Sequence, residues 1–331
     1  MPTFKLGRSL VIAVASFALL AGACKKGGSS SSTKTEEAKA DEGDALGDKL
    51  DGYIECYNNV DKDAHDSMRY YARWIDDTEK GPSGKEKSVN GVHEIATSDV
   101  TSCKKKLEEG KAKKPALPDL EAKAAAYLAA LEALQPKAAE AKTYYDRKDY
   151  QDDKFAKAKA MHAPLWQAFL AFDKASDGFS DALEAESDKS LTAEIAAVEK
   201  RSGKGLYWQK LNFGQKAKNL LHDLNKENPD PKKAEEVVAD FTKTTDEMLA
   251  YAEAHTDQRP SNWSTFESKV KSFVEEAKER MRTIRDKKPL SSGEKSLIES
   301  GHAEMVTGHA AKLSSGYNAV VAFGNGLRFK D

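Results

Sequence analysis

The chain has 331 residues, of which 39% are apolar and 32% are charged, so it can form a core and is not disordered throughout. Its 52 basic and 54 acidic residues give a net charge of −2, without the basic excess typical of proteins that bind nucleic acid. Three cysteines are too few for a small domain held together by several disulfides.

The N-terminal residues have the features of a bacterial export signal. Lys5 and Arg8 precede an uncharged run over 10–22, about 13 residues long, whereas a helix that crosses hydrocarbon needs ~20. Ala21-Gly22-Ala23 then leads to Cys24, a pattern similar to the lipobox at which bacterial lipoproteins are cut and acylated. We therefore predict a cleaved signal that ends at residue 23 and a lipidated Cys24. The alternative is an ordinary signal that leaves this cysteine as a free thiol.

Residues 24–43 have the composition of a flexible tether. Gly27 and Gly28 precede four serines, and no apolar periodicity follows until about residue 44. Two or more acyl chains on Cys24, palmitate among them, would hold this tether on a bilayer durably. The next residue is Lys25, not the aspartate that retains lipoproteins at the inner membrane. The sequence thus predicts a lipid-anchored protein of the outer membrane that faces the periplasm.

Export changes the interpretation of the two remaining cysteines, Cys56 and Cys103, because thiols pair in an oxidising compartment. Each lies on an apolar stripe with helical spacing. The stripes run through Tyr53, Cys56, Tyr57 and Val60, and through Val92, Ala96, Val100, Cys103 and Leu107. Helices packed through these faces would bring the two sulfur atoms together, and closing the loop would stabilise the fold by roughly 4 kcal/mol. The alternative is a pair of buried free thiols.

The rest of the chain shows helical periodicity and no sustained strand alternation. The first helix is predicted over 44–77 and ends before the loop Gly81-Pro82-Ser83-Gly84. Further helices are predicted over 92–109, 119–145, 152 or 153 to 183, 190–201, 206–225, 232–255, 263–286 and 292–323. Pro136 and Pro164 are expected to bend or divide the helices that contain them.

These elements predict an all-α fold, a single elongated bundle of about eight helices over 44–329. The last predicted helix carries four glycines on one stripe, at positions 301, 308, 316 and 324. Each interior glycine costs up to ~1 kcal/mol relative to alanine. The stripe therefore indicates close approach to a neighbouring helix, and a glycine-lined ligand groove is the alternative.

Several short pieces also occur in a specific order along the chain. They are Tyr53-Ile54-Glu55-Cys56-Tyr57-Asn58, Tyr71-Ala72-Arg73-Trp74, Gly81-Pro82-Ser83-Gly84, Cys103, Tyr144-Tyr145, the segment 150–157, Gly203-Lys204 and the segment 284–289. In this order the chain resembles the YiiG-like bacterial lipoproteins, a family that carries a helical domain of unknown function. The resemblance implies a helical envelope lipoprotein and supports a Cys56–Cys103 pair. It supplies no catalytic residue.

Motifs for catalysis and metal binding are incomplete. His93-Glu94 begins like a zinc-protease helix, but Thr97 stands where the second histidine is required. Glu299 and His302 have the spacing found in di-iron bundles, which need a second such pair that this sequence lacks. Neither a nucleophile elbow nor a phosphate loop is present. We predict no catalytic residue, no metal and no cofactor.

Two polar regions are candidates for a binding surface. The first runs from Tyr144 to His162 and is either a solvated, well-capped helix or a surface that contacts a partner. Its candidate residues are Tyr144, Tyr145, Tyr150, Asp152, Asp153 and His162. The second is a basic run with Arg282 and Arg285, either a solvated face or a contact for phosphate-bearing polymer, because the arginine geometry suits phosphate.

Together these features predict a lipid-anchored helical protein of the cell envelope that serves as a non-catalytic binding or structural module. Its expected partners are the membrane and an envelope protein or anionic envelope polymer, but not nucleic acid. A carrier that holds a small ligand or polymer in a groove between helices is the alternative. A hydrolase with an unrecognised site is less favoured.

Overall fold

The computed structural model describes residues 33–329, and their side chains from residue 46 on. The predicted signal and the lipidation site Cys24 lie outside the described residues. The described chain is helical and contains no strand, which confirms the all-α class. Its contacts divide into two compact units, one that ends at Ser187 and one that begins at Asp188. The single bundle predicted from the sequence is therefore two packed units, because periodicity shows which face of a helix is buried but not which helix covers it.

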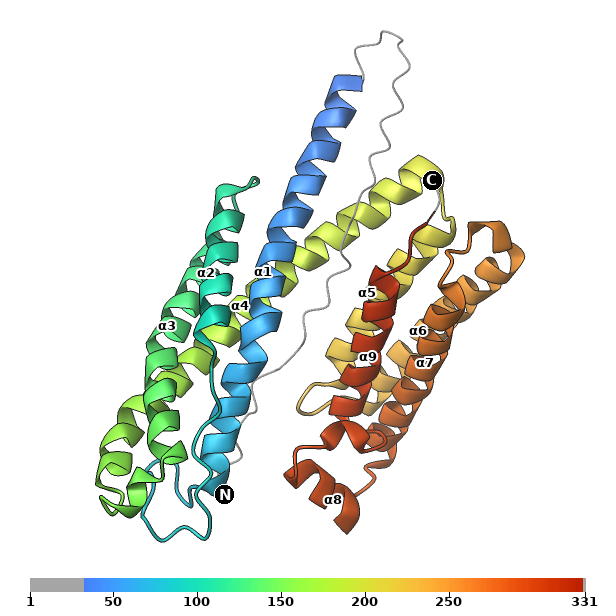
Figure 1. Ribbon diagram of the computed structural model, residues 1–331. Coiled ribbons are helices and arrows are strands. Elements are labelled where there is room, and N and C mark those ends of the chain that lie inside the picture. The colour runs from blue at the N-terminus through green and yellow to red at the C-terminus, as the bar shows by residue number, and fades with distance from the viewer. Residues whose placement is uncertain (1–32, 330–331) are drawn as a thin grey trace. The chain divides into compact units, whose positions relative to one another are not determined.

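The first unit contains α1, α2, α3 and the first part of α4, and α2 packs against both α1 and α3 (Figure 1). The elements are α1 (Thr33–Trp74), α2 (Thr97–Ala112), α3 (Pro118–Asp146), the 3-10 turn η1 (Asp149–Gln151) and α4 (Ala156–Ser202). Its core is aromatic, with Tyr127, Phe169, Phe172 and Phe179 fully buried. Because α1 begins at Thr33, the helix includes residues 33–43 of the expected tether.

The helix α4 joins two helices that were predicted separately. It continues through the expected gap between residues 183 and 190 and through Pro164, just as α3 continues through Pro136. A proline removes one backbone donor and crowds the preceding turn. In α3 the fully buried Leu134 and Ala138 flank the proline, so packing of this turn holds the helix together.

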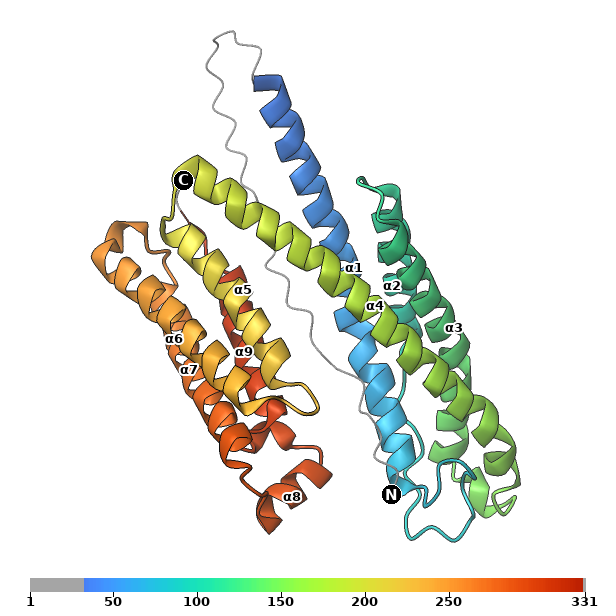
Figure 2. The same ribbon diagram turned by 180° about the vertical axis from the view of Figure 1, so that it is seen from behind.

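The second unit is a bundle in which α5 packs against α6 and α9, and α7 packs against α6 and α9 (Figure 2). The elements are α5 (Leu206–Leu224), α6 (Pro231–Ala254), η2 (Thr256–Gln258), α7 (Trp263–Asp286), α8 (Ser292–Glu299), η3 (Ala303–Met305) and α9 (Ala310–Asn325). Phe213, Phe241, Phe266 and Phe273 are fully buried where these helices meet. The unit thus has an aromatic core of its own.

The prediction of one long helix over 292–323 is wrong, because two of its glycines interrupt the helix. Gly301 and Gly308 have φ of 87° and 75°, which breaks the chain into α8, η3 and α9. A side chain on Gly316 would meet Phe273 and the carboxylate of Glu276 on α7. This confirms the predicted close helix approach at that position.

Gly308→Ala is expected to destabilise the second unit by about 1–2 kcal/mol, because an L side chain is strained in the left-handed region. The added Cβ would also meet the Thr283 hydroxyl. Urea unfolding followed by circular dichroism measures the loss. Gly293→Ala is the matched control, because no atom lies within 4 Å of its added Cβ and its φ is not positive. Equal losses in the two variants would contradict this account.

Candidate functional site

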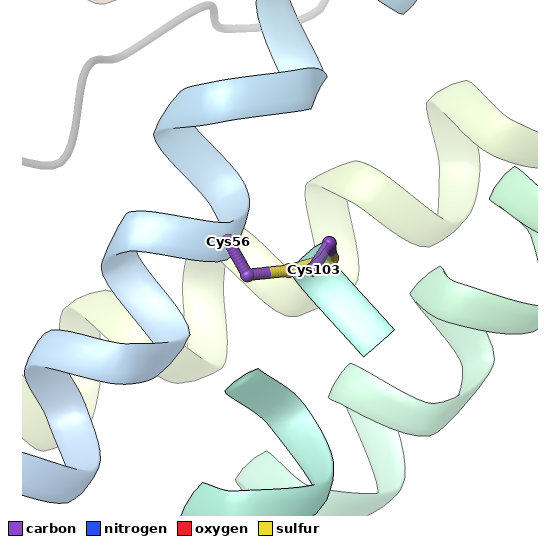
Figure 3. Close-up of a disulfide and its surroundings, with 2 residues drawn as sticks. All are labelled: Cys56 and Cys103. Carbon is purple, nitrogen blue, oxygen red and sulfur yellow. A yellow bond between two sulfur atoms is a disulfide. The ribbon is translucent and has the colours of Figure 1, made fainter. Parts of the chain in front are cut away.

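A disulfide joins Cys56 of α1 to Cys103 of α2 (Figure 3). Their Cα atoms are 4.3 Å apart, and each residue is only 1% exposed. Both lie on the apolar faces through which α1 and α2 pack. The bond therefore ties two core helices together and is positioned for stability, since its burial keeps external thiols away.

Much of the predicted binding surface lies in the core of the first unit. Tyr144, Tyr145 and His162 are 1%, 6% and 4% exposed. Tyr144 donates a hydrogen bond to Asp153 at 2.8 Å, while Tyr150 is half-buried and Asp152 is exposed. The expectation of a shared tyrosine and histidine surface is therefore wrong. These side chains carry polar tips on rings that bury readily, so their polarity in sequence did not indicate exposure.

Both ring nitrogens of His162 have partners inside the protein. Nε2 lies 2.9 Å from the Thr78 carbonyl oxygen, which can only accept, so Nε2 carries the proton. Nδ1 then accepts from the Tyr71 hydroxyl at 3.0 Å. Burial lowers the pKa of His162, although the bond to Thr78 opposes this shift. The neutral imidazole acts as a connector between α4, α1 and the loop that follows α1.

That loop, residues 75–96, covers the aromatic end of the first unit. Gly81 and Gly91, with φ of 81° and 75°, lie against the rings of His162 and Tyr145. The Trp74 indole donates to the Gly91 carbonyl oxygen at 3.0 Å. Pieces that carry the family resemblance, around residues 71–74, 81–84, 144–145 and 150–157, thus meet at one end of the unit. Packing of this end accounts for those pieces without any ligand.

A buried polar network, missed in the sequence, joins α1 to α4. His65 Nδ1 lies 3.2 Å from Asp61 Oδ2, and Nε2 lies 3.1 Å from Asp173 Oδ1. Ser176 donates to Asp61 Oδ1 at 2.5 Å. Burial alone would lower the pKa of His65, but the hydrogen bonds with Asp173 and Asp61 outweigh burial and raise the pKa to about 10. The network is a charged imidazolium held between two carboxylates.

This network lacks the geometry of a hydrolase triad. The hydroxyl of Ser176 donates to a carboxylate and not to the histidine, so the histidine is not placed to take its proton. Ser176 is 1% exposed and His65 is 5% exposed. The arrangement fits a buried ion cluster that fixes α1 against α4. The i, i+4 spacing of Asp61 and His65 on the stripe of α1 was the sequence signal for it.

The free energy of unfolding is expected to fall as the pH rises from about 6.5 toward 10, because of His65. A raised folded-state pKa contributes stability that is fully present below the unfolded value and is lost as pH passes through the folded value. Urea midpoints of His65→Gln should depend less on pH over this window than those of the wild type. His93→Gln, at an exposed position, should keep the wild-type slope. Identical slopes in all three proteins would refute the assignment.

Arg282 and Arg285 lie on α7 in the second unit and have partners there. Arg282 pairs with Glu279, and Arg285 pairs with Asp286 at 2.7 Å. Arg282 also lines an open groove of about 590 Å³ between α6 and α7, whose apolar residues include Val238 and Met281. The two arginines and the tyrosines of the first candidate surface belong to different units. Both arginines already pair with carboxylates on α7, which weakens the basis for a dedicated phosphate site.

Residues 33–329 contain no group of three or more histidine, cysteine, aspartate or glutamate side chains that could hold a metal ion. No helix in that range combines the length and the apolar character needed to cross a bilayer.

Comparison with known proteins identifies the family. Residues 44–325 match the model of a protein family of unknown function, DUF3829. The chain is 30% identical over 289 residues to the uncharacterized protein YiiG of Escherichia coli strain K12. The matched region covers 87% of this chain and 81% of that protein. No solved structure matches. The resemblance inferred from the sequence is thus confirmed, and the chain belongs to the DUF3829 family.

Proposed function

We propose that this protein is a bacterial lipoprotein, acylated at Cys24 and held on the periplasmic side of the outer membrane. Its two helical units serve there as a non-catalytic binding or structural module. The anchor is supported by the basic start, the short apolar run and the small residues directly before Cys24. The observation that carries the proposal is the Cys56–Cys103 disulfide, because disulfides persist in oxidising compartments outside the cytosol.

A module without catalysis is supported by the use that the fold makes of its polar side chains. Tyr144 donates to Asp153, and His162 bonds to the Tyr71 hydroxyl and to the Thr78 carbonyl oxygen, all inside the first unit. His65 likewise pairs with Asp61 and Asp173, and Ser176 donates a hydrogen bond to Asp61. Each of these groups holds helices together through bonds inside the fold, so we assign these groups a structural role. A rigid, disulfide-tied surface on a lipid anchor suits the docking of an envelope partner.

The groove between α6 and α7 favours a second candidate, a carrier of a ligand or an envelope polymer. Its apolar residues would contact such a ligand, and its rim carries charges of both signs. Lys278 pairs with Glu275, and Arg282 pairs with Glu279. Because these rim cations already have carboxylate partners, the groove suits a weak peripheral contact better than a charged ligand. The carrier is therefore the second choice.

Labelling cells with radioactive palmitate tests the anchor. The wild-type protein is expected to incorporate label and to sediment with membranes, whereas Cys24→Ala loses the label. Cys103→Ala is the matched control. It should keep the label, because the acyl chains are attached to Cys24 and not to Cys103. Label retained by Cys24→Ala, or an unlabelled wild type, would contradict the proposal.

A further inference from the structure

The helix α8 differs in packing from the other described α-helices, because none of its residues is buried. Leu297 and Ile298 on α8 are half-buried. Leu290, just before the helix, is 38% exposed, and Met305, in η3, is 61% exposed. Both views place α8 at the end of the second unit where α7 ends and α9 begins (Figures 1 and 2). The apolar residues of this short helix are thus only partly covered inside the unit.

Backbone hydrogen bonds hold the end of α8 close to Met305. His302 donates to the Leu297 carbonyl oxygen at 2.8 Å, and Met305 donates to the His302 carbonyl oxygen at 3.0 Å. Two tight turns therefore connect the end of α8 to Met305, and α8 contacts η3 directly. We call Leu290, Leu297, Ile298 and Met305, with the neighbouring Lys287, Lys288 and Lys295, the α8 surface.

Three exposed lysines lie on the α8 surface, and the carboxylate of Glu299 on α8 is exposed as well. Lys287, Lys288 and Lys295 are exposed, and no described carboxylate lies within ion-pair distance of any of them. Glu294 accepts hydrogen bonds from the Ser291 backbone N–H and hydroxyl, which fixes it in a capping box. Glu304 lies 3.5 Å from His302. Three ammonium groups and one free carboxylate thus lie near apolar side chains that are exposed or half-buried.

We propose that the α8 surface makes a second contact with an anionic bilayer, in addition to the lipid at Cys24; this inference rests on the proposed function. Apolar side chains beside lysines are the composition of segments that lie in the membrane interface, where lysine stems extend toward anionic headgroups. Each lysine near such a surface raises binding roughly fivefold. A second copy of the chain is a poorer occupant, because the free lysines of two α8 surfaces would repel each other.

An environment-sensitive fluorophore on Met305→Cys tests the contact. In the mature protein the disulfide and the lipid occupy the native cysteines, so only the introduced thiol reacts. Reconstituted in vesicles of phosphatidylethanolamine and phosphatidylglycerol, the probe should shift to shorter emission wavelengths and brighten, because it leaves water for the membrane interface. Leu170→Cys is the matched control, because Leu170 is 37% exposed and lies on α4 in the first unit. Its probe should not change.

Membrane flotation separates the two proposals. An unchanged Met305 probe on protein that floats with the vesicles would overturn the α8 contact and leave the anchor intact. Protein that carries no lipid would overturn the anchor, and the same probe on a Cys24→Ala background, mixed with vesicles, would then decide the α8 contact alone. In that mixture, Lys287→Gln with Lys288→Gln should weaken binding roughly fivefold per lysine. A shift without vesicles that grows with protein concentration would indicate a second copy and contradict the inference.

Discussion

Lys49→Met is expected to lower the free energy of unfolding of the first unit by about 3–5 kcal/mol, the cost of breaking a buried ion pair by removing one partner. Lys49 is fully buried. Its Nζ pairs with Glu121 at 2.5 Å and donates to the carbonyl oxygens of Pro115 at 2.8 Å and Lys113 at 3.2 Å. One side chain of α1 thus satisfies three acceptors around the turn between α2 and α3. Methionine matches its length but cannot donate, so these acceptors lose a buried partner.

Lys62→Met is the control for this prediction. Lys62 lies on the same helix and pairs with Asp66, but its side chain is 68% exposed. Exposed pairs contribute only about 0–1 kcal/mol, so this variant should unfold close to the wild type. Urea unfolding followed by circular dichroism compares the two. A similar small loss in both variants would show that burial of Lys49 does not matter.

Removing the disulfide by Cys56→Ala with Cys103→Ala is expected to cost about 4 kcal/mol in the chain-entropy model. The bond closes a loop with a sequence separation of 47, and its loss restores conformational freedom to the unfolded chain. Urea unfolding of the double variant and of the wild type in reductant should give the same lowered midpoint, because both lack the cross-link. A wild-type midpoint that does not respond to complete reduction would contradict a stabilising role.

Helix boundaries were best predicted where strong local signals mark both ends. The predicted range 263–286 coincides with α7, between Pro260 and Pro289. Proline disfavours helix on its N-terminal side, so such ends are encoded locally. The glycines of the last segment carry a weaker signal. Gly301 and Gly308 break the helix at positive φ, whereas Gly316 lies within α9 against α7. Only the neighbouring helix distinguishes these two uses.

The candidate site was less predictable, because its contacts join residues far apart in sequence. His65 and Asp173 are 108 residues apart, and Tyr71 and His162 are 91 residues apart. Helical periodicity places each of these residues on a face but does not say which faces meet. The apolar stripes did predict the Cys56–Cys103 pair, and the family resemblance supported it. Burial of Tyr145 required knowledge of the loop over residues 75–96, in which Gly91 lies against its ring.

The intact mass of protein extracted from bacterial membranes tests the account most directly. We expect a chain whose first residue is Cys24, heavier than its sequence by the mass of the attached acyl chains and lighter by the two hydrogen atoms lost in the Cys56–Cys103 bond. Treatment with reductant should restore those two hydrogen atoms and leave the acyl mass in place. A chain that still begins at Met1, or one that begins elsewhere without acyl mass, would contradict the lipoprotein assignment.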